Sequence, residues 1–325
     1  MTIYGYHASH EQVAPRELLA SVKRAEQAGF DAAMCSDHLT PWSERQAHSG
    51  FAWSWLGAAL EATSLTYGVV NAPGQRYHPV IIAQAIATLE QMNPGRFWAA
   101  LGSGQAINEH ITGDRWPDKD TRKARLRESV DVIRALLAGE EVTHEGLITV
   151  DRARVWSLPA TPPPLIGAAI TEATAGWAGE WADGLITISQ PLDQLRRVVG
   201  AYRDAGGRGD VFIQAQVSLE DTRDKALAVA HDQWRTNIFP SPLSWDLPTV
   251  EHFDQAAEHV SQSAVAEAVF CTADAGELAE HLHAFESVGA SRVYIHGVTQ
   301  DQARYIDRMG EQVLPQLRVP AGTGV

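Results

Sequence analysis

The stretch GLITISQPLDQLRRVVGAYRDAGGRGDVFIQAQVS, residues 184–218, decides the fold class. Residues 184–188 and 211–218 are short apolar runs typical of buried strands, and residues 192–205 between them have apolar side chains at helical spacing. A strand, a helix and a strand in succession indicate a parallel pair, because the helix carries the chain back to the start of the next strand. We therefore expect an α/β fold with a parallel sheet.

The same alternation runs through the rest of the 325 residues. Further strands are predicted at residues 3–6, 32–36, 65–71, 97–101, 165–168 and 292–296. Eight strands, each followed by a helix, favour a closed (β/α)8 TIM barrel over the alternative, an open doubly wound sheet of about six strands. Insertions are expected after several strands: a hairpin at residues 142–155 and a polar helical segment without a clear strand at 223–265. One barrel domain over residues 1–318 and a disordered tail over 319–325 are predicted.

The composition restricts the partners. With 26 basic and 40 acidic residues the formal net charge is −14, and no block of basic residues occurs, so nucleic-acid binding is not expected. No apolar run is long enough to span a bilayer, and the N-terminal residues lack a signal peptide's pattern, so membrane binding is not expected either. Cys35 and Cys271 form no CxxC motif, which fits two buried thiols and a cytoplasmic location.

Chemistry in a barrel takes place at the carboxyl ends of the strands. Ser36, Asp37 and His38 follow the second predicted strand, and an imidazole there can transfer a proton near neutral pH. The alternative is that Asp37 caps a loop while His38 lies on the surface. Trp42 follows closely, either as a pocket wall or as part of the core.

Two further strand ends carry groups that suit a cofactor. Gly104 ends a Gly-Ser-Gly turn that lets a planar ligand approach the backbone, although the third glycine of the dinucleotide fingerprint is missing. The segment from Ala168 to Thr171 precedes a helix, where free N–H groups suit a phosphate, unless Thr171 only caps that helix. No HxH or HExxH motif occurs, so a metal site is not expected.

Together the motifs resemble the deazaflavin-dependent glucose-6-phosphate dehydrogenase group of the luciferase-like superfamily. The resemblance covers residues 3–200 well and the last third loosely. It is carried by HASHEQ (7–12), SDH (36–38), RY (76–77), GSGQA (102–106), RLRES (125–129) and ADG (182–184). It implies a TIM barrel, usually a homodimer, with an isoalloxazine-type ring at the barrel mouth.

The resemblance also implies roles for individual residues. Asp37 would contact the cofactor, His38 would lie over the reacting substrate carbon, and Trp42 and Glu11 would line the same cavity. Val69 and Val70 would form a bulge with a non-prolyl cis peptide under the ring, a bond that costs about 3–4 kcal/mol. The cofactor-binding set is Asp37, Val69, Val70, Ala72, Gly104, Asn108, Ala168, Ala169, Ile170 and Thr171.

Several positions depart from that group's pattern. Gln105 stands where the group has a Glu that donates or accepts a proton, and an amide cannot do so. Ile188 and Pro191 replace a Thr and a Lys of the sugar-phosphate pocket, and Glu267 stands near a further Lys position. A carboxylate repels a phosphate, so glucose 6-phosphate is not the expected substrate.

Residues 49–62 and 71–79 (NAPGQRYHP) match more closely a sister group described as probable non-deazaflavin flavoproteins. This favours FMN as cofactor over the alternative, coenzyme F420. We expect an enzyme that moves hydride between the flavin and a small organic substrate near His38, Trp42, Gln105 and Glu11. If reduced flavin reacts with oxygen the enzyme is a monooxygenase, and a separate flavin reductase would be a partner. A non-catalytic flavin-binding protein and a cofactor-free enzyme using His38 and Glu11 as acid and base are the rival hypotheses.

Overall fold

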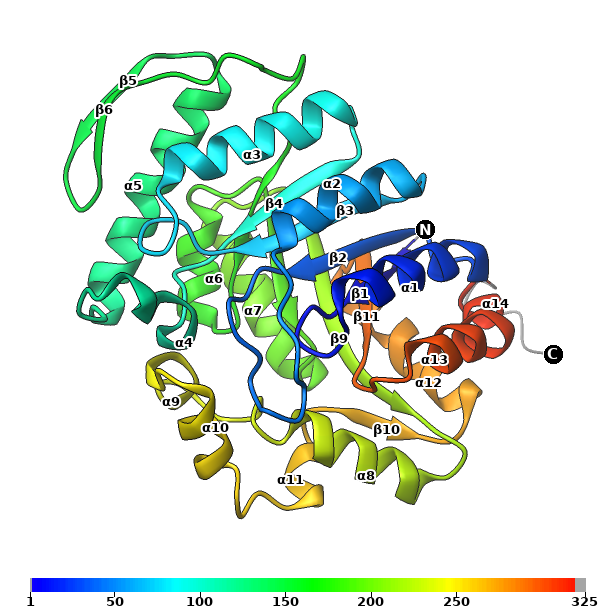
Figure 1. The fold of residues 1–325 in the computed structure, drawn as a ribbon. Helices are drawn as coiled ribbons and strands as arrows, with labels where there is room; N and C mark the ends of the chain where they lie inside the picture. Colours follow the sequence, from blue (N-terminus) through cyan, green and yellow to red (C-terminus); the bar gives the residue numbers. More distant parts are fainter. Residues whose placement is uncertain (1, 319–325) are drawn as a thin grey trace.

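Eight parallel strands close a barrel in the computed structural model, which describes residues 2–318 (Figure 1). Each strand pairs with the next, β8 pairs with β9, and β11 returns to β1, so the sheet has no open edge among these eight strands. The predicted TIM barrel is confirmed and the open sheet is excluded. The predicted tail, residues 319–325, lies outside the described residues. The barrel strands are β1 (Ile3–Ala8), β2 (Ala32–Ser36), β3 (Thr66–Asn71), β4 (Phe97–Leu101), β7 (Leu165–Ala168), β8 (Gly184–Ile188), β9 (Asp210–Leu219) and β11 (Arg292–Gly297).

Helices surround the barrel because each has one apolar face. In α7, Leu195, Val198 and Tyr202 are buried at helical spacing. No helix within residues 2–318 combines the length and the apolar character needed to cross a membrane. The α-helices are α1 (Pro15–Ala28), α2 (Ala52–Ala62), α3 (Pro79–Met92), α4 (Ala106–Glu109), α5 (Lys119–Leu137), α6 (Glu172–Gly179), α7 (Leu192–Asp204), α8 (Arg223–Trp234), α9 (Leu243–Asp246), α10 (Val250–Ala256), α11 (Gln262–Ala266), α12 (Ala275–His283), α13 (Gln302–Arg308) and α14 (Leu314–Leu317). Short non-α turns are η1 (His110–Thr112), η2 (Ala284–Val288) and η3 (Met309–Val313).

Two insertions interrupt the regular alternation. The predicted hairpin is confirmed as β5 (Val142–Glu145) and β6 (Thr149–Ala153), which stand out from the barrel wall (Figure 1). The second insertion, between β9 and β11, holds α8 to α11 and one strand that the sequence analysis missed, β10 (Phe270–Thr272). It pairs with the far end of β9, from Val217 to Leu219, and its three residues are too few to show a strand period.

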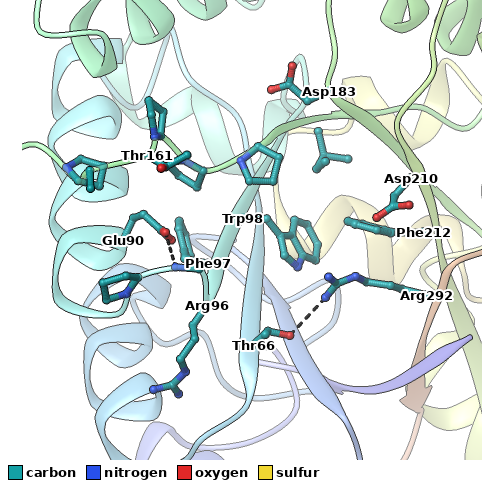
Figure 2. Close-up of a pocket in the computed structure, with 18 residues that line it drawn as sticks. Thr66, Glu90, Arg96, Phe97, Trp98, Thr161, Asp183, Asp210, Phe212 and Arg292 are labelled. Carbon is teal, nitrogen blue, oxygen red and sulfur yellow. Dashed lines mark hydrogen bonds between the residues drawn. The ribbon is translucent and has the colours of Figure 1, made fainter. Parts of the chain in front are cut away.

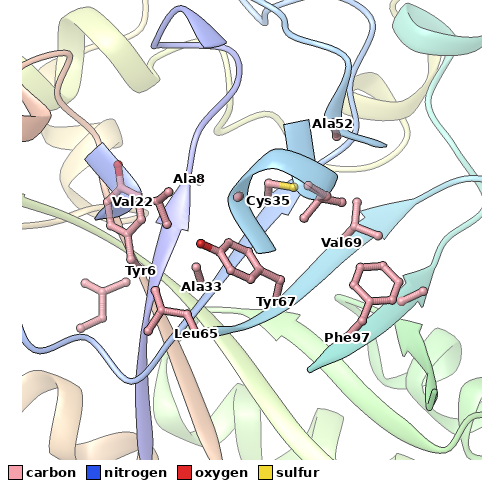
Figure 3. Packing of buried hydrophobic residues seen from close by; sticks show 14 of the residues in the cluster. Tyr6, Ala8, Val22, Ala33, Cys35, Ala52, Leu65, Tyr67, Val69 and Phe97 are labelled. Carbon is pink, nitrogen blue, oxygen red and sulfur yellow. The ribbon is translucent and has the colours of Figure 1, made fainter. Parts of the chain in front are cut away.

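Side chains of each barrel strand alternate between two cores. Tyr6, Tyr67 and Val69 point outward and pack under the helices (Figure 3). Trp98 and Tyr294 point into the barrel, where Trp98 Nε1 donates to the Tyr294 hydroxyl at 3.0 Å. Because of this alternation, every second side chain of a strand points toward the barrel axis.

Gly68 faces the barrel interior directly beneath the Trp98 ring. A Cβ atom at Gly68 would lie 1.9 Å from the Trp98 ring carbons, so Gly68→Ala should destabilise the fold by about 1–3 kcal/mol through overpacking. Gly200, in the middle of α7, has open space at its Cβ position, and Gly200→Ala should leave stability equal or slightly higher. Urea unfolding of both variants measures the difference, and equal stabilities would contradict the packing described.

The expected cis peptide between Val69 and Val70 is wrong. Within the described chain only Ser241–Pro242 is cis, and β3 keeps an unbroken register on both sides, with Val70 opposite Ser36 and Ala100. A bulge or a cis bond would break that register, and a non-prolyl cis bond needs surroundings that enforce it. Because the alternation is intact, Val69 belongs to the outer core and Val70 alone turns toward the barrel interior.

Candidate active site

The carboxyl ends of the strands bring Glu11 and His38 into direct contact. His38 Nδ1 is hydrogen-bonded to Glu11 Oε1, and Ser9 Oγ donates to Glu11 Oε2 at 2.8 Å. Burial alone would raise the pKa of the Glu11 carboxyl, but the charge and hydrogen bond of His38 outweigh it and hold the pKa well below its usual range. An ionised carboxylate only accepts, so the shared proton lies on Nδ1, and in the uncharged form of the ring Nε2 is the nitrogen that carries the lone pair. With its side chain 17% exposed, His38 can reach a ligand.

Trp42 forms a wall beside this pair. Its ring stands edge-on to His38 at 5.2 Å and edge-on to Phe253 at 5.1 Å. Phe253 comes from α10, in the insertion after β9, and Asp254 beside it accepts hydrogen bonds from Ser43 Oγ (2.7 Å) and the Glu44 N–H (3.0 Å). The insertion therefore fixes the loop that carries Trp42.

Asp37 is the centre of a buried polar cluster. Trp53 Nε1 (3.1 Å) and Asn71 Nδ2 (2.8 Å) donate to its Oδ2, and the Tyr77 hydroxyl donates to Oδ1 at 3.3 Å. Arg76 donates to the Asp37 carbonyl at 2.8 Å. The Asp37 side chain has no exposed surface, so its carboxylate contacts protein groups that hold the mouth in shape. Its predicted contact with a cofactor stays a prediction.

The turn after β4 lies against the turn after β3. Gly104 has a φ of +81°, and a Cβ there would approach the Ala72 Cβ to 3.4 Å, so the predicted residues Ala72 and Gly104 meet. Asn108 Oδ1 accepts from the Leu39 N–H (2.8 Å), while Asn108 Nδ2 donates to Gln105 Oε1 (3.3 Å). The carboxamide of Gln105 is thereby oriented, and in the described chain its NH2 group has no protein partner.

Small residues line one side of the floor of the mouth. Val70 and Ala168 point inward, and a Cβ on Gly102 would lie 3.7 Å from the Ala168 Cβ, so only small side chains occupy this side. The Ala169 N–H donates a hydrogen bond to the Ile186 carbonyl. Thr171 caps α6 by accepting a hydrogen bond from the Thr174 N–H, as the alternative interpretation expected. The amides of Ile170 and Thr171 make no hydrogen bond within residues 2–318 and can receive an acidic group.

Uncharged polar side chains form the floor on the opposite side of the mouth. The sequence motifs did not indicate that these residues lie together. His7 stacks on His296 with ring centres 4.1 Å apart. His296 Nε2 donates to Gln12 Oε1 at 2.8 Å, and Gln12 Nε2 donates to Gln233 Oε1 at 3.1 Å. Burial lowers the pKa of His296 to about 4 and that of His7 well below its usual value, so both rings are uncharged at neutral pH. Gln12 and His296 are 284 positions apart, and only their shared strand-end location could have indicated the contact.

A cavity of about 590 Å³ opens at the other end of the barrel, where Trp98 and Arg292 lie under a proline-rich segment (Figure 2). Arg96 in its wall donates to the carbonyls of Leu60, Thr63 and Leu65, and Asp183 pairs with Arg134, so these charges serve the structure. Barrel enzymes place their chemistry at the carboxyl ends, so the mouth is the candidate active site. Within residues 2–318 no group of three His, Cys, Asp or Glu side chains could hold a metal.

Comparisons with known proteins agree with this geometry. The luciferase-like monooxygenase family model matches residues 4–292. The F420-dependent glucose-6-phosphate dehydrogenase of Intrasporangium calvum is 36% identical over 97% of this chain and 98% of its own, and that of Beutenbergia cavernae is 34% identical over 97% of each. Among solved structures, an F420-dependent secondary alcohol dehydrogenase in complex with an F420-acetone adduct is 30% identical, covers 98% of this chain and 99% of that chain, and has a TM-score of 0.90.

Proposed function

The chain belongs to the luciferase-like monooxygenase family, and we propose that it is a coenzyme F420-dependent dehydrogenase that interconverts a secondary alcohol and its ketone. The relatives whose names include F420 align over almost the whole chain. Their agreement supports F420, the alternative cofactor of the sequence analysis, better than FMN. The expected oxidoreductase class is retained.

The Glu11–His38 pair is the observation that carries the proposal. Oxidation of an alcohol to a ketone removes a hydride from carbon and a proton from oxygen. When bound, coenzyme F420 supplies the ring that takes the hydride. His38 Nε2, the nitrogen left free by Glu11, accepts the hydroxyl proton, and the Glu11 carboxylate stabilises the resulting imidazolium. In the reverse direction the same nitrogen returns the proton to the ketone oxygen.

Gln105 and Trp42 complete the substrate side. The NH2 group of Gln105 can donate to the substrate oxygen as negative charge develops on it, which is a role that an amide can fill. Trp42 restricts the approach to His38 from the outer side. Holding the substrate carbon against the ring in this way lowers the entropic cost of hydride transfer.

Glucose 6-phosphate remains an unsuitable substrate in this proposal. Pro191 and the exposed Glu267 line the same small cavity beside the mouth, and none of its described lining residues is Lys or Arg. A phosphate there would meet a carboxylate and no cation. An uncharged alcohol suits the site better.

Titration of the purified protein with F420 and, separately, with FMN tests the cofactor. We expect F420 to bind at least about tenfold more tightly, which is about 1.4 kcal/mol, measured by the change in cofactor fluorescence. Addition of 2-propanol to the F420 complex should then bleach the visible absorption of the oxidised cofactor. Tighter binding of FMN would restore the flavin hypothesis, and binding of neither would favour a cofactor-free enzyme.

A further inference from the structure

The cavity beside the barrel mouth that Pro191 and Glu267 line has a volume of about 300 Å³ and takes no part in the proton transfer described so far. One wall is the turn from β8 into α7, with Ser189 and Pro191. The other wall is the turn from α11 into β10, with Val269 and Phe270, closed by Ala284 of η2. We call this cavity the side recess.

The walls of the side recess are mostly apolar and aromatic. His281 stacks on Phe270 with ring centres 4.0 Å apart and 11° between the planes, and Phe285 meets His281 edge-on at 5.1 Å. Burial lowers the pKa of His281 to about 4, so the stacked imidazole is uncharged at neutral pH. The one charged side chain among the described lining residues, Glu267, is exposed to solvent. A neutral hydrocarbon group matches such walls, and an ion does not.

The side recess adjoins both halves of the mouth. Ser189 Oγ donates to Gln216 Oε1 at 3.0 Å, and Gln216 lies opposite His296 in the sheet register. Gln190 Nε2 donates to the Ile170 carbonyl at 3.2 Å, in the segment proposed to hold the cofactor's acidic group. Hydrogen bonds therefore connect the side recess to the His296 side of the mouth and to the segment proposed to hold the cofactor.

We propose that the side recess binds an apolar arm of the substrate, so that the preferred substrates are secondary alcohols with an alkyl or aryl group several carbons long. The size fits, because an engineered apolar cavity of about 150 Å³ in another protein binds benzene, and this one has about twice that volume. The proposal rests on the proposed function for the reacting end of the molecule.

Turnover of a graded series of alcohols by the F420-loaded protein tests the inference. From 2-propanol to 2-hexanol, kcat/KM should rise about threefold to fourfold per added methylene, the effect of burying one CH2 group. 4-Phenyl-2-butanol should exceed 2-propanol at least about 30-fold by the same count. A series in which kcat/KM is flat or falls with length overturns the inference, while 2-propanol oxidation by itself upholds the proposed function.

A filled side recess supplies the matched comparison. Ala284→Trp puts bulk into the cavity and should lower the ratio of kcat/KM for 4-phenyl-2-butanol to that for 2-propanol at least about tenfold. Ser287→Trp adds the same bulk on the exposed side of η2, outside the lining, and should keep the ratio of the unmodified protein. An equal ratio in both variants would place the arm elsewhere.

Binding can be measured without turnover. Saturation-transfer NMR should detect 4-phenyl-2-butanol on the cofactor-free protein and on Ser287→Trp, but not on Ala284→Trp. Absence of this signal from the unmodified protein overturns the side recess proposal whatever the cofactor titration gives. Its presence in a protein that binds no F420 would uphold the side recess and reject the proposed function, so the two failures are distinguishable.

Discussion

Replacement of His38 by alanine should lower kcat for alcohol oxidation about 10²–10⁴-fold, because the hydroxyl proton then has no acceptor at the mouth. Coenzyme F420 should bind with nearly unchanged affinity, because the proposed floor of the ring is formed by Val70 and Ala168 and not by His38. Stopped-flow measurement of cofactor reduction separates the two quantities. Unchanged turnover would contradict the role of His38.

Glu11→Gln should reproduce much of this loss. An amide in place of the carboxylate no longer stabilises the imidazolium, so the pH at which the rate falls on acidification should move. The protein contains a matched control on the hairpin insertion, where His144 Nε2 pairs with Glu128 Oε2 at 2.9 Å far from the mouth. His144→Ala and Glu128→Gln should leave kcat and its pH profile as they are.

Acid should unfold the protein steeply between about pH 6.5 and 4. Burial lowers the pKa of His10, His281 and His296 to about 4 and that of His7 well below its usual value. The unfolded chain binds protons at these four side chains below about pH 6.5, whereas the folded chain does not, so stability falls as the pH falls. Four protons correspond to a slope of about 5 kcal/mol per pH unit. Glu90 and Glu109 act in the opposite direction, since burial raises the pKa of their carboxyls, but they are two groups against four.

Urea unfolding at a series of pH values measures this slope. His10→Phe removes one of the four groups from a ring site packed edge-on against Trp55, and should reduce the slope by about one proton, or about 1.4 kcal/mol per pH unit. His259→Gln changes an exposed side chain and should leave the slope as in the unmodified protein. A stability that is constant from pH 7 to 4.5 would mean that the buried rings accept protons in the folded state.

The barrel could be predicted because each of its strands is a separate apolar run followed by a helix with its own period. Residues 97–101 and 184–188 were placed at the bounds that the structure gives. Short or distant contacts could not be predicted in this way. β10 has three residues, and the stacking of His7 on His296 joins the two ends of the barrel sequence, which meet only when the sheet closes.

In the candidate site, too, some features could be predicted from the sequence and others could not. The resemblance led us to place Glu11, His38 and Trp42 in one cavity, and the structure brings them into contact. It also led us to expect a strained peptide at Val69, which regular pairing on both sides of β3 excludes. Local strain depends on the packing of neighbouring strands, and a motif match carries no information about that packing.

The cluster around Asp37 has a consequence for how this site can change during evolution. One carboxylate is shared by donors from α2, β3 and the loop after β3, so the effect of replacing Trp53, Asn71 or Tyr77 depends on which of the others is present. Such substitutions are epistatic, because removing one donor changes what the remaining donors contribute. Variation at the mouth is therefore easier to accumulate at positions outside this cluster, such as Gln105 and the walls of the side recess, and substrate preference can drift there while the Asp37 cluster stays fixed.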